Sequence, residues 1–146
     1  MKFEGSVIIK KPRDIVTALF IDPNHNGEYQ DGFIKKELIS GEAAQDNAIS
    51  KMYYKYGKRD MELTETILKN DLPYSFEAFY HHKHMDNTMT CTFIEMGPEK
   101  TEYKYEVEYT RVNWFLPKLM AILFPGMYRK QGHKWMIQFK EFVEKQ

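Results

Sequence analysis

The sequence has a single cysteine, Cys91, among its 146 residues. One thiol cannot close an internal disulfide, and no Cys-x-x-Cys pair or Cys/His spacing is present to hold a zinc ion. Charge of one sign is not in excess either, because Lys and Arg number 21 and Asp and Glu also number 21. Binding to phosphate backbones requires a basic surplus, so we expect no nucleic acid as a partner. We interpret Cys91 as a small, buried apolar side chain.

Long apolar runs are absent as well. Near the N-terminus only Val7 to Ile9 lie together between charged residues, which is too short for a signal peptide, and we therefore expect a cytoplasmic protein. A second apolar stretch, residues 114–128, carries one charge, Lys118, and falls short of the about 20 residues that a membrane-spanning helix needs. We interpret 114–128 as a buried or interfacial segment, and transient contact with a membrane surface is one of its predicted roles.

Catalytic signatures are also missing. No GxSxG, Walker loop, GxGxxG or HExxH motif occurs, so the common hydrolase, nucleotide-binding and zinc-protease functions lack support, and no cofactor is expected. Hydrophobic residues make up 42% and charged residues 29% of the chain, which is typical of a globular protein. The length predicts one domain over residues 1–146.

The first third of the sequence predicts a strand followed by helices. Residues 3–9 alternate as a strand with one buried face. Pro12 suits a first helical turn, and apolar residues then recur at helical spacing as far as Phe20, until Asp22-Pro23 ends the run. A short second helix or turn is predicted over 24–31.

The middle of the sequence predicts a meander of six antiparallel strands that begins at Phe33. Turn dipeptides separate the strands at Asp46-Asn47, Gly57-Lys58, Asn70-Asp71, Asp86-Asn87 and Gly97-Pro98. The clearest strand covers residues 101–109, where aromatic and charged residues alternate. We predict that Tyr103, Tyr105 and Tyr109 face the interior and that Lys104, Glu106 and Glu108 face solvent.

The last third predicts a helix that changes direction. Asn113 is a candidate N-cap, and Pro125-Gly126 interrupts the helical pattern. Two apolar stripes lie on nearly opposite sides of a straight helix: one contains Phe115, Leu119, Ile122 and Leu123, and the other contains Tyr128, Trp135, Phe139 and Phe142. One sheet cannot bury both stripes, so we predict a kink or break near Pro125.

The order of these elements resembles the START-like, or SRPBCC, superfamily, which includes the major birch-pollen allergen and polyketide cyclase-like proteins. The resemblance is carried by VIIKKPRDIVTALFIDP, EKTEYKYEVEY and GHKWMIQFKEFVEK and covers essentially the whole chain. It implies an α+β helix-grip fold in which a curved seven-stranded antiparallel sheet wraps a long C-terminal helix. It also implies that the first strand pairs between the second and the last. A lipocalin-like barrel is the structural alternative, but it would not place a helix directly after the first strand.

A helix-grip fold implies a cavity between sheet and helix for a small hydrophobic ligand. The candidate lining residues are Phe76, Ala78, Tyr80, Tyr103, Tyr105 and Tyr109 from the strands and Leu119, Leu123 and Met127 from the helix. The same side chains could simply fill a core. Inward tyrosine hydroxyls need partners, however, and a ligand or trapped water can supply them.

Several histidines and glutamates are candidate metal ligands or acid–base groups. In a strand, His82 and His84 share a face and His81 points away, so only two ligands converge and no metal site is expected. Glu65 or Glu77 could act as a general acid or base if it pointed inward, with His82 as a partner. We predict instead that both face water as cross-strand partners of lysine or arginine.

Three functions remain open at this stage. The first is binding or transport of a small hydrophobic or amphipathic molecule, such as a lipid, isoprenoid or aromatic metabolite. The second is an enzyme of the polyketide cyclase or dehydratase kind, and the third is a protein-interaction module similar to the Hsp90 activators. The sequence carries no signal of ligand identity or oligomeric state.

Overall fold

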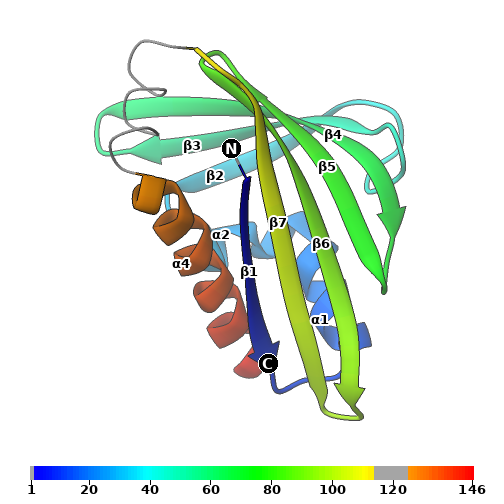
Figure 1. Ribbon diagram of the computed structural model, residues 1–146. Helices are drawn as coiled ribbons and strands as arrows, with labels where there is room; N and C mark the ends of the chain where they lie inside the picture. Colours follow the sequence, from blue (N-terminus) through cyan, green and yellow to red (C-terminus); the bar gives the residue numbers. More distant parts are fainter. Residues whose placement is uncertain (1, 114–124) are drawn as a thin grey trace.

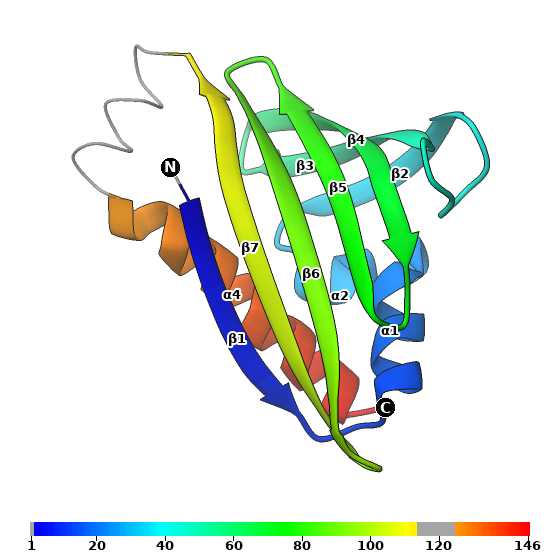
Figure 2. The ribbon, with the colours of Figure 1, turned by 45° about the vertical axis from the view of Figure 1, so that its right-hand side comes forward.

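A computed structural model of the protein describes residues 2–113 and 125–146, and beyond Pro125 it describes the side chains of 130 and 132–146. Its strands are β1 (Lys2–Ile9), β2 (Phe33–Ser40), β3 (Ile49–Tyr56), β4 (Arg59–Asp71), β5 (Ser75–His82), β6 (Met85–Gly97) and β7 (Lys100–Val112). Its helices are α1 (Arg13–Ile21), the 3-10 turn η1 (Pro23–His25), α2 (Asn26–Tyr29) and α4 (Pro125–Glu144). Figures 1 and 2 show one curved sheet, with α4 on its concave side.

The strands form a single antiparallel sheet in the order β1-β7-β6-β5-β4-β3-β2. The predicted six-strand meander from Phe33 is confirmed, since β2 to β7 pair with their neighbours in sequence. The predicted pairing of β1 between β2 and β7 is wrong: within the described residues β1 pairs with β7 alone and β2 with β3 alone. The chain between them forms α1, η1 and α2, which carry it across to the far edge before β2 begins.

The two edge strands are protected in different ways. At β1, the Lys140 ammonium donates to the Ile8 carbonyl oxygen at 2.8 Å, and the Lys10 backbone N–H donates to Glu144 at 2.8 Å. The helix α4 therefore covers the outer side of β1. β2 instead has register irregularities near both ends and carries Lys35 and Lys36, features that discourage pairing with another chain.

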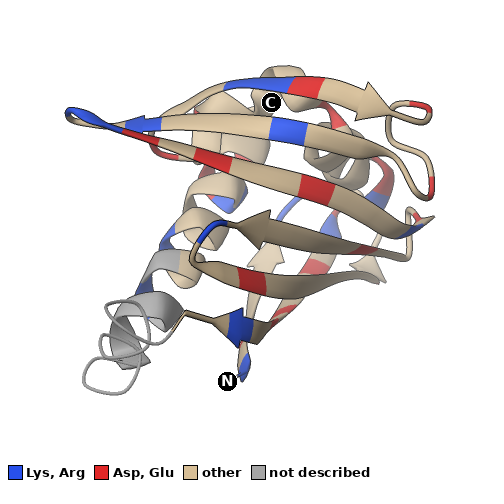
Figure 3. Cartoon of the chain, turned by 90° about the horizontal axis from the view of Figure 1, so that it is seen from above, with Lys and Arg blue, Asp and Glu red and all other residues tan. Residues whose placement is uncertain are grey.

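The predicted faces of β7 are confirmed. Tyr103 and Tyr105 are buried, whereas Lys104 and Glu108 are exposed and Glu106 is half-buried. Basic and acidic residues are interspersed along the strands (Figure 3). Cys91 is completely buried, as predicted.

Two predicted turns are wrong. Asn70 and Asp71 are the last residues of β4, and the chain turns after them, at residues 72–74. The β5–β6 hairpin turns at Lys83 and His84, and Asp86 and Asn87 lie inside β6. The cause is tertiary: Asp86 stands directly opposite Arg111 of β7, so their side chains lie on one face and pair at 2.8 Å. Long-range charge pairing thus outweighs the turn propensity of the dipeptide.

The C-terminal helix is described from Pro125 to Glu144. The predicted break near Pro125 depends on residues 114–124, which lie outside the described residues, as does the main part of the segment proposed to touch a membrane. None of the described helices has the length and apolarity needed to cross a membrane.

The hydrophobic core occupies the end of the sheet nearest α1. Phe20 of α1 makes edge-on ring contacts with Phe76, Phe93 and Phe139 at centroid distances of 5.4, 5.1 and 6.0 Å. Val16 and Val143 are completely buried beside this cluster. Because these side chains fill one end, the open space lies toward the other.

Candidate functional site: a cavity between the sheet and the last helix

The concave face and α4 enclose a cavity of about 520 Å³. All seven strands contribute to its wall, and along β3, β6 and β7 every second residue lines it, as expected for the inward face of a strand. Trp135, Met136 and Phe139 of α4 and Phe20 of α1 cover it from the helical side. The volume falls in the range of roughly 300–1,000 Å³ that is typical of small-molecule sites.

Five of the predicted lining residues border this cavity: Phe76, Tyr80, Tyr103, Tyr105 and Tyr109. Ala78 faces the same side of β5 but is completely buried and does not border the cavity. Its methyl group is short, and the longer side chains of Ile67 and Met89 stand directly opposite on the neighbouring strands. Leu119, Leu123 and the side chain of Met127 lie outside the described residues.

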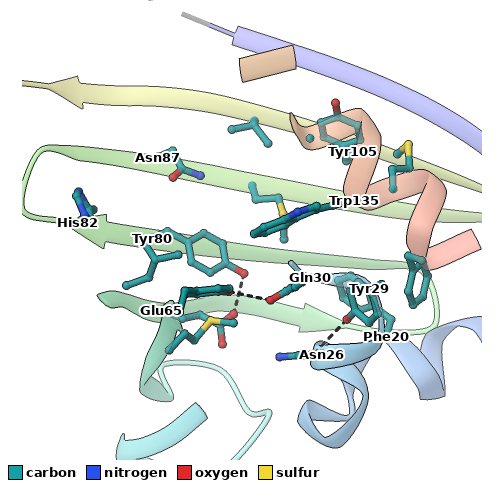
Figure 4. A pocket seen from close by; sticks show the side chains of 18 of the residues that line it. Phe20, Asn26, Tyr29, Gln30, Glu65, Tyr80, His82, Asn87, Tyr105 and Trp135 are labelled. Atoms are coloured by element: carbon teal, nitrogen blue, oxygen red, sulfur yellow. Dashed lines mark hydrogen bonds between the residues drawn. The ribbon is translucent and has the colours of Figure 1, made fainter. Parts of the chain in front are cut away.

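Glu65 is the residue of the candidate site whose side-chain direction the sequence predicts wrongly. Its side chain is buried in the cavity wall and accepts a hydrogen bond from the Tyr80 hydroxyl at 2.7 Å (Figure 4). Lys36 Nζ of the edge strand β2 lies 2.6 Å from the other carboxylate oxygen. That oxygen accepts no well-oriented hydrogen bond within the described residues, so its attraction to Lys36 is an electrostatic one. Glu77, by contrast, lies on the outer side of β5, as predicted.

The register of the sheet explains why Glu65 points inward. It stands opposite Ser50 on one side and Tyr80 on the other, and both of these residues belong to the concave face. An isolated carboxylate there would lose several kcal/mol of solvation, and Lys36 offsets part of that cost by pairing with it. Burial, followed by the charge of Glu65, holds the pKa of the Tyr80 hydroxyl well above its usual value. Tyr80 therefore stays protonated and donates to Glu65.

Two further tyrosines of the wall are hydrogen-bonded to the segment before β2. Tyr54 donates to the Gln30 side-chain oxygen at 2.7 Å, and Tyr29 donates to the Asn26 side-chain oxygen at 3.1 Å. Burial raises the pKa of both hydroxyls. The side chains of α2 and its C-terminal end are thus fixed against the cavity by groups that remain neutral.

His82 borders the cavity next to the β5–β6 turn. The backbone N–H of His84 donates to its Nδ1 at 3.1 Å, so in the neutral ring the proton is on Nε2. Partial burial lowers the pKa of His82, and the positive charges of His84, Lys83, His81 and Arg111 lower it further. No group of three or more potential metal ligands occurs within the described residues.

Tyr105 of β7 packs tightly against both β1 and α4. A Cβ atom added at Gly5 would lie 2.6 Å from a ring carbon of Tyr105, and one added at Gly132 would lie 3.0 Å from its hydroxyl oxygen. Glycine at both positions lets the tyrosine ring fit between β1 and α4. This contact fixes how far the helix stands from the strands, and hence the width of the cavity.

Solved structures share this arrangement over nearly their whole length. The Zhui aromatase/cyclase from Streptomyces sp. R1128 aligns with a TM-score of 0.80 at 10% identity, covering 99% of this chain and 93% of that one. A START superfamily protein from Mycobacterium smegmatis aligns with a TM-score of 0.71 at 7% identity, covering 98% and 94%. This chain has the helix-grip fold.

A third helix-grip structure, Ara h 8.0201, has a TM-score of 0.78 at 10% identity and covers 100% of this chain and 99% of that one. No family model matches the sequence, and no curated protein matches it. At such low identities the likeness concerns the fold. The resemblance to START-like proteins is confirmed at that level, and the function has to be argued from the cavity itself.

Proposed function

We propose that the protein binds a small, uncharged amphipathic molecule in the cavity between the sheet and α4. The observation that carries this proposal is the composition of the wall, in which a buried carboxylate, Glu65 with Lys36 and Tyr80, stands among mainly apolar and aromatic side chains. If these side chains served only to fill a core, the folded state would be more stable with apolar residues in place of the buried ion pair. Apolar cavities with a few placed polar groups are typical of ligand sites.

The ligand is expected to be uncharged because the cavity charges already compensate each other. Lys36 and Glu65 lie 2.6 Å apart, so an added carboxylate would be repelled by Glu65 and an added ammonium group by Lys36. A hydroxyl or carbonyl group meets neither penalty. The structural neighbours support binding in general, since they include a START superfamily protein and an aromatase/cyclase, but they indicate no particular ligand.

Binding can be tested with Nile red, an uncharged apolar dye that fluoresces in apolar surroundings. We expect fluorescence to rise and saturate with wild-type protein and to be lost in Met89→Trp, because Met89 borders the cavity and tryptophan would fill part of it. The matched control is Met96→Trp on the same strand, where Met96 is 51% exposed. Overpacking costs about 1–3 kcal/mol, so folding of both variants is checked by thermal melting. Equal dye binding by both folded variants would place the binding site elsewhere.

A second candidate function is proton-transfer catalysis on the bound molecule, and the buried carboxylate of Glu65 favours it. A carboxylate held in an apolar cavity can remove a proton from carbon beside a carbonyl group, while Lys36 stabilises the enolate oxygen that forms. The proton moves to Glu65, and the C–H electron pair becomes the new C=C bond. Among the alternatives considered from sequence, this corresponds to the cyclase-like one.

The two functions can be separated by deuterium exchange. In D₂O, 2-tetralone exchanges its hydrogens beside the carbonyl, and the rate is followed by NMR. Catalysis requires wild-type protein to accelerate exchange and Glu65→Gln to remove the acceleration while Nile red binding persists. An exchange rate equal to that of buffer would leave binding as the function.

A further inference from the structure

The concave wall contains one row of polar side chains that runs across the strands. Glu65 on β4 stands directly opposite Tyr80 on β5, and Tyr80 stands opposite Asn87 on β6. Asn87 in turn stands opposite Tyr109 on β7. All four residues border the cavity, and Figure 4 shows the first three side by side. We call Glu65, Tyr80, Asn87 and Tyr109 the polar row.

The wall beside the polar row is apolar. The next row toward the core consists of Ile67, Ala78, Met89 and Val107, again paired strand by strand, and Met89 and Val107 of this row border the cavity. Across the cavity, α4 contributes the apolar or aromatic side chains of Trp135, Met136 and Phe139. A molecule in the cavity therefore meets hydrogen-bonding groups along the polar row and apolar surface at α4 and at Met89 and Val107. Elsewhere in the wall, Tyr29 and Tyr54 already donate to Asn26 and Gln30.

The spacing of the polar row follows from sheet geometry. Neighbouring strands are about 4.8 Å apart, so the backbone positions of the four residues span roughly 14 Å across the sheet. Within the row, the Tyr80 hydroxyl and the Glu65 carboxylate meet at 2.7 Å. The Tyr80 hydroxyl donates its hydrogen bond to Glu65, so the Tyr80 oxygen can still accept a hydrogen bond from a ligand. The bond found from the Asn87 amide, to the Thr88 carbonyl oxygen, is 3.5 Å long and lies beyond the usual hydrogen-bond range, so a better partner could replace it.

We propose that the ligand is a flat ring system with hydroxyl or carbonyl oxygens along one edge, bound across the strands with that edge on the polar row. This inference rests on the proposed function and adds the distribution of polar groups on the ligand. A chain with a single polar end would satisfy one position of the row and leave the others against hydrocarbon. A ring system with polar groups on opposite edges would place one of them against α4 or the apolar row, which is unfavourable.

Two isomers of one compound provide the test. In 2,7-dihydroxynaphthalene both hydroxyls lie toward the same long edge, whereas in 2,6-dihydroxynaphthalene they lie toward opposite edges. The isomers share composition and overall polarity, and both are fluorescent. We expect the 2,7 isomer to bind about fivefold to tenfold more tightly in fluorescence titrations, as one net hydrogen bond of about 1 kcal/mol predicts.

Variants then assign the preference to the polar row. Asn87→Leu and Tyr80→Phe keep the side-chain size, and each should remove most of the difference between the isomers. The control is Thr90→Val on the outer face of β6, opposite Glu77 and Glu106, which should leave the preference unchanged. If the isomers bind wild-type protein equally, the row does not orient the ligand, although the cavity still binds it. If neither isomer nor Nile red binds, the proposed function itself fails.

Discussion

Replacing Lys36 by methionine tests whether Glu65 is a buried, ion-paired carboxylate. The substitution keeps the length of the side chain but removes its charge, so the carboxylate loses the partner that lies 2.6 Å away. Breaking a buried pair from one side costs about 3–5 kcal/mol. The Lys36 side chain is 19% exposed, so water can replace part of the interaction, and we expect a loss near the lower end, about 3 kcal/mol.

A double-mutant cycle makes the reasoning specific. Glu65→Gln added to Lys36→Met removes the unpaired charge, so the double variant should be more stable than Lys36→Met alone by about 2 kcal/mol. Urea unfolding measures both free energies. The matched control is Lys51→Met, because Lys51 and Glu62 form an exposed pair at 3.9 Å and its loss should cost less than about 1 kcal/mol.

The reasoning would be refuted if Lys36→Met were as stable as Lys51→Met and if adding Glu65→Gln to Lys36→Met restored no stability. Glu65 would then face water, as the sequence first predicted.

Three further predictions concern other parts of the cavity wall. The pKa of His82 is lowered in the folded protein, so protonation of this side chain favours the unfolded state. The free energy of unfolding should therefore fall as the pH drops below 6.5, the ordinary pKa of histidine. His82→Gln should reduce that loss, as measured by urea unfolding at pH 5 and at pH 8. Gly5→Ala should destabilise the protein by about 1–3 kcal/mol and lower its melting temperature, because the added methyl group would lie 2.6 Å from the Tyr105 ring. A melting temperature equal to that of wild type would contradict this contact. Burial raises the pKa of the Cys91 thiol to about 12, so a disulfide reagent should modify it only after urea is added, and rapid labelling of the native protein would show that the thiol is accessible.

The sequence predicts elements better than it predicts their pairing. Alternation placed Tyr103 and Tyr105 on the inner face of β7 correctly, because a half-buried strand repeats every two residues. It could not place Glu65, whose direction depends on which residue of β5 stands opposite. Tyr80 was already assigned to the interior, and the pairing of β4 with β5 would have brought Glu65 there with it.

The β5–β6 hairpin is a second place where the local sequence pattern does not determine the structure. Asp86-Asn87 has the composition of a turn, and local propensity alone favours it there. Its partner Arg111 is 25 residues away in sequence and binds Asp86 through two nitrogen atoms, which no local pattern reveals. Moving the turn to Lys83 and His84 brings Asn87 into β6 and into the polar row. The register between β5, β6 and β7, which the sequence does not predict, is therefore also what aligns the polar row of the candidate site.

Because α4 covers the outer side of β1, this strand has an unusual position in co-translational folding. β1 precedes β7, its strand partner among the described residues, and Lys140 and Glu144 of α4 follow later still in the sequence. The successive hairpins from β2 to β7 can pair as they are synthesised, since each strand follows its neighbour directly. β1 has to wait for its partner strand through the synthesis of all these hairpins. During that interval both edges of β1 are exposed to other chains and to chaperones, and the docking of α4 ends the exposure.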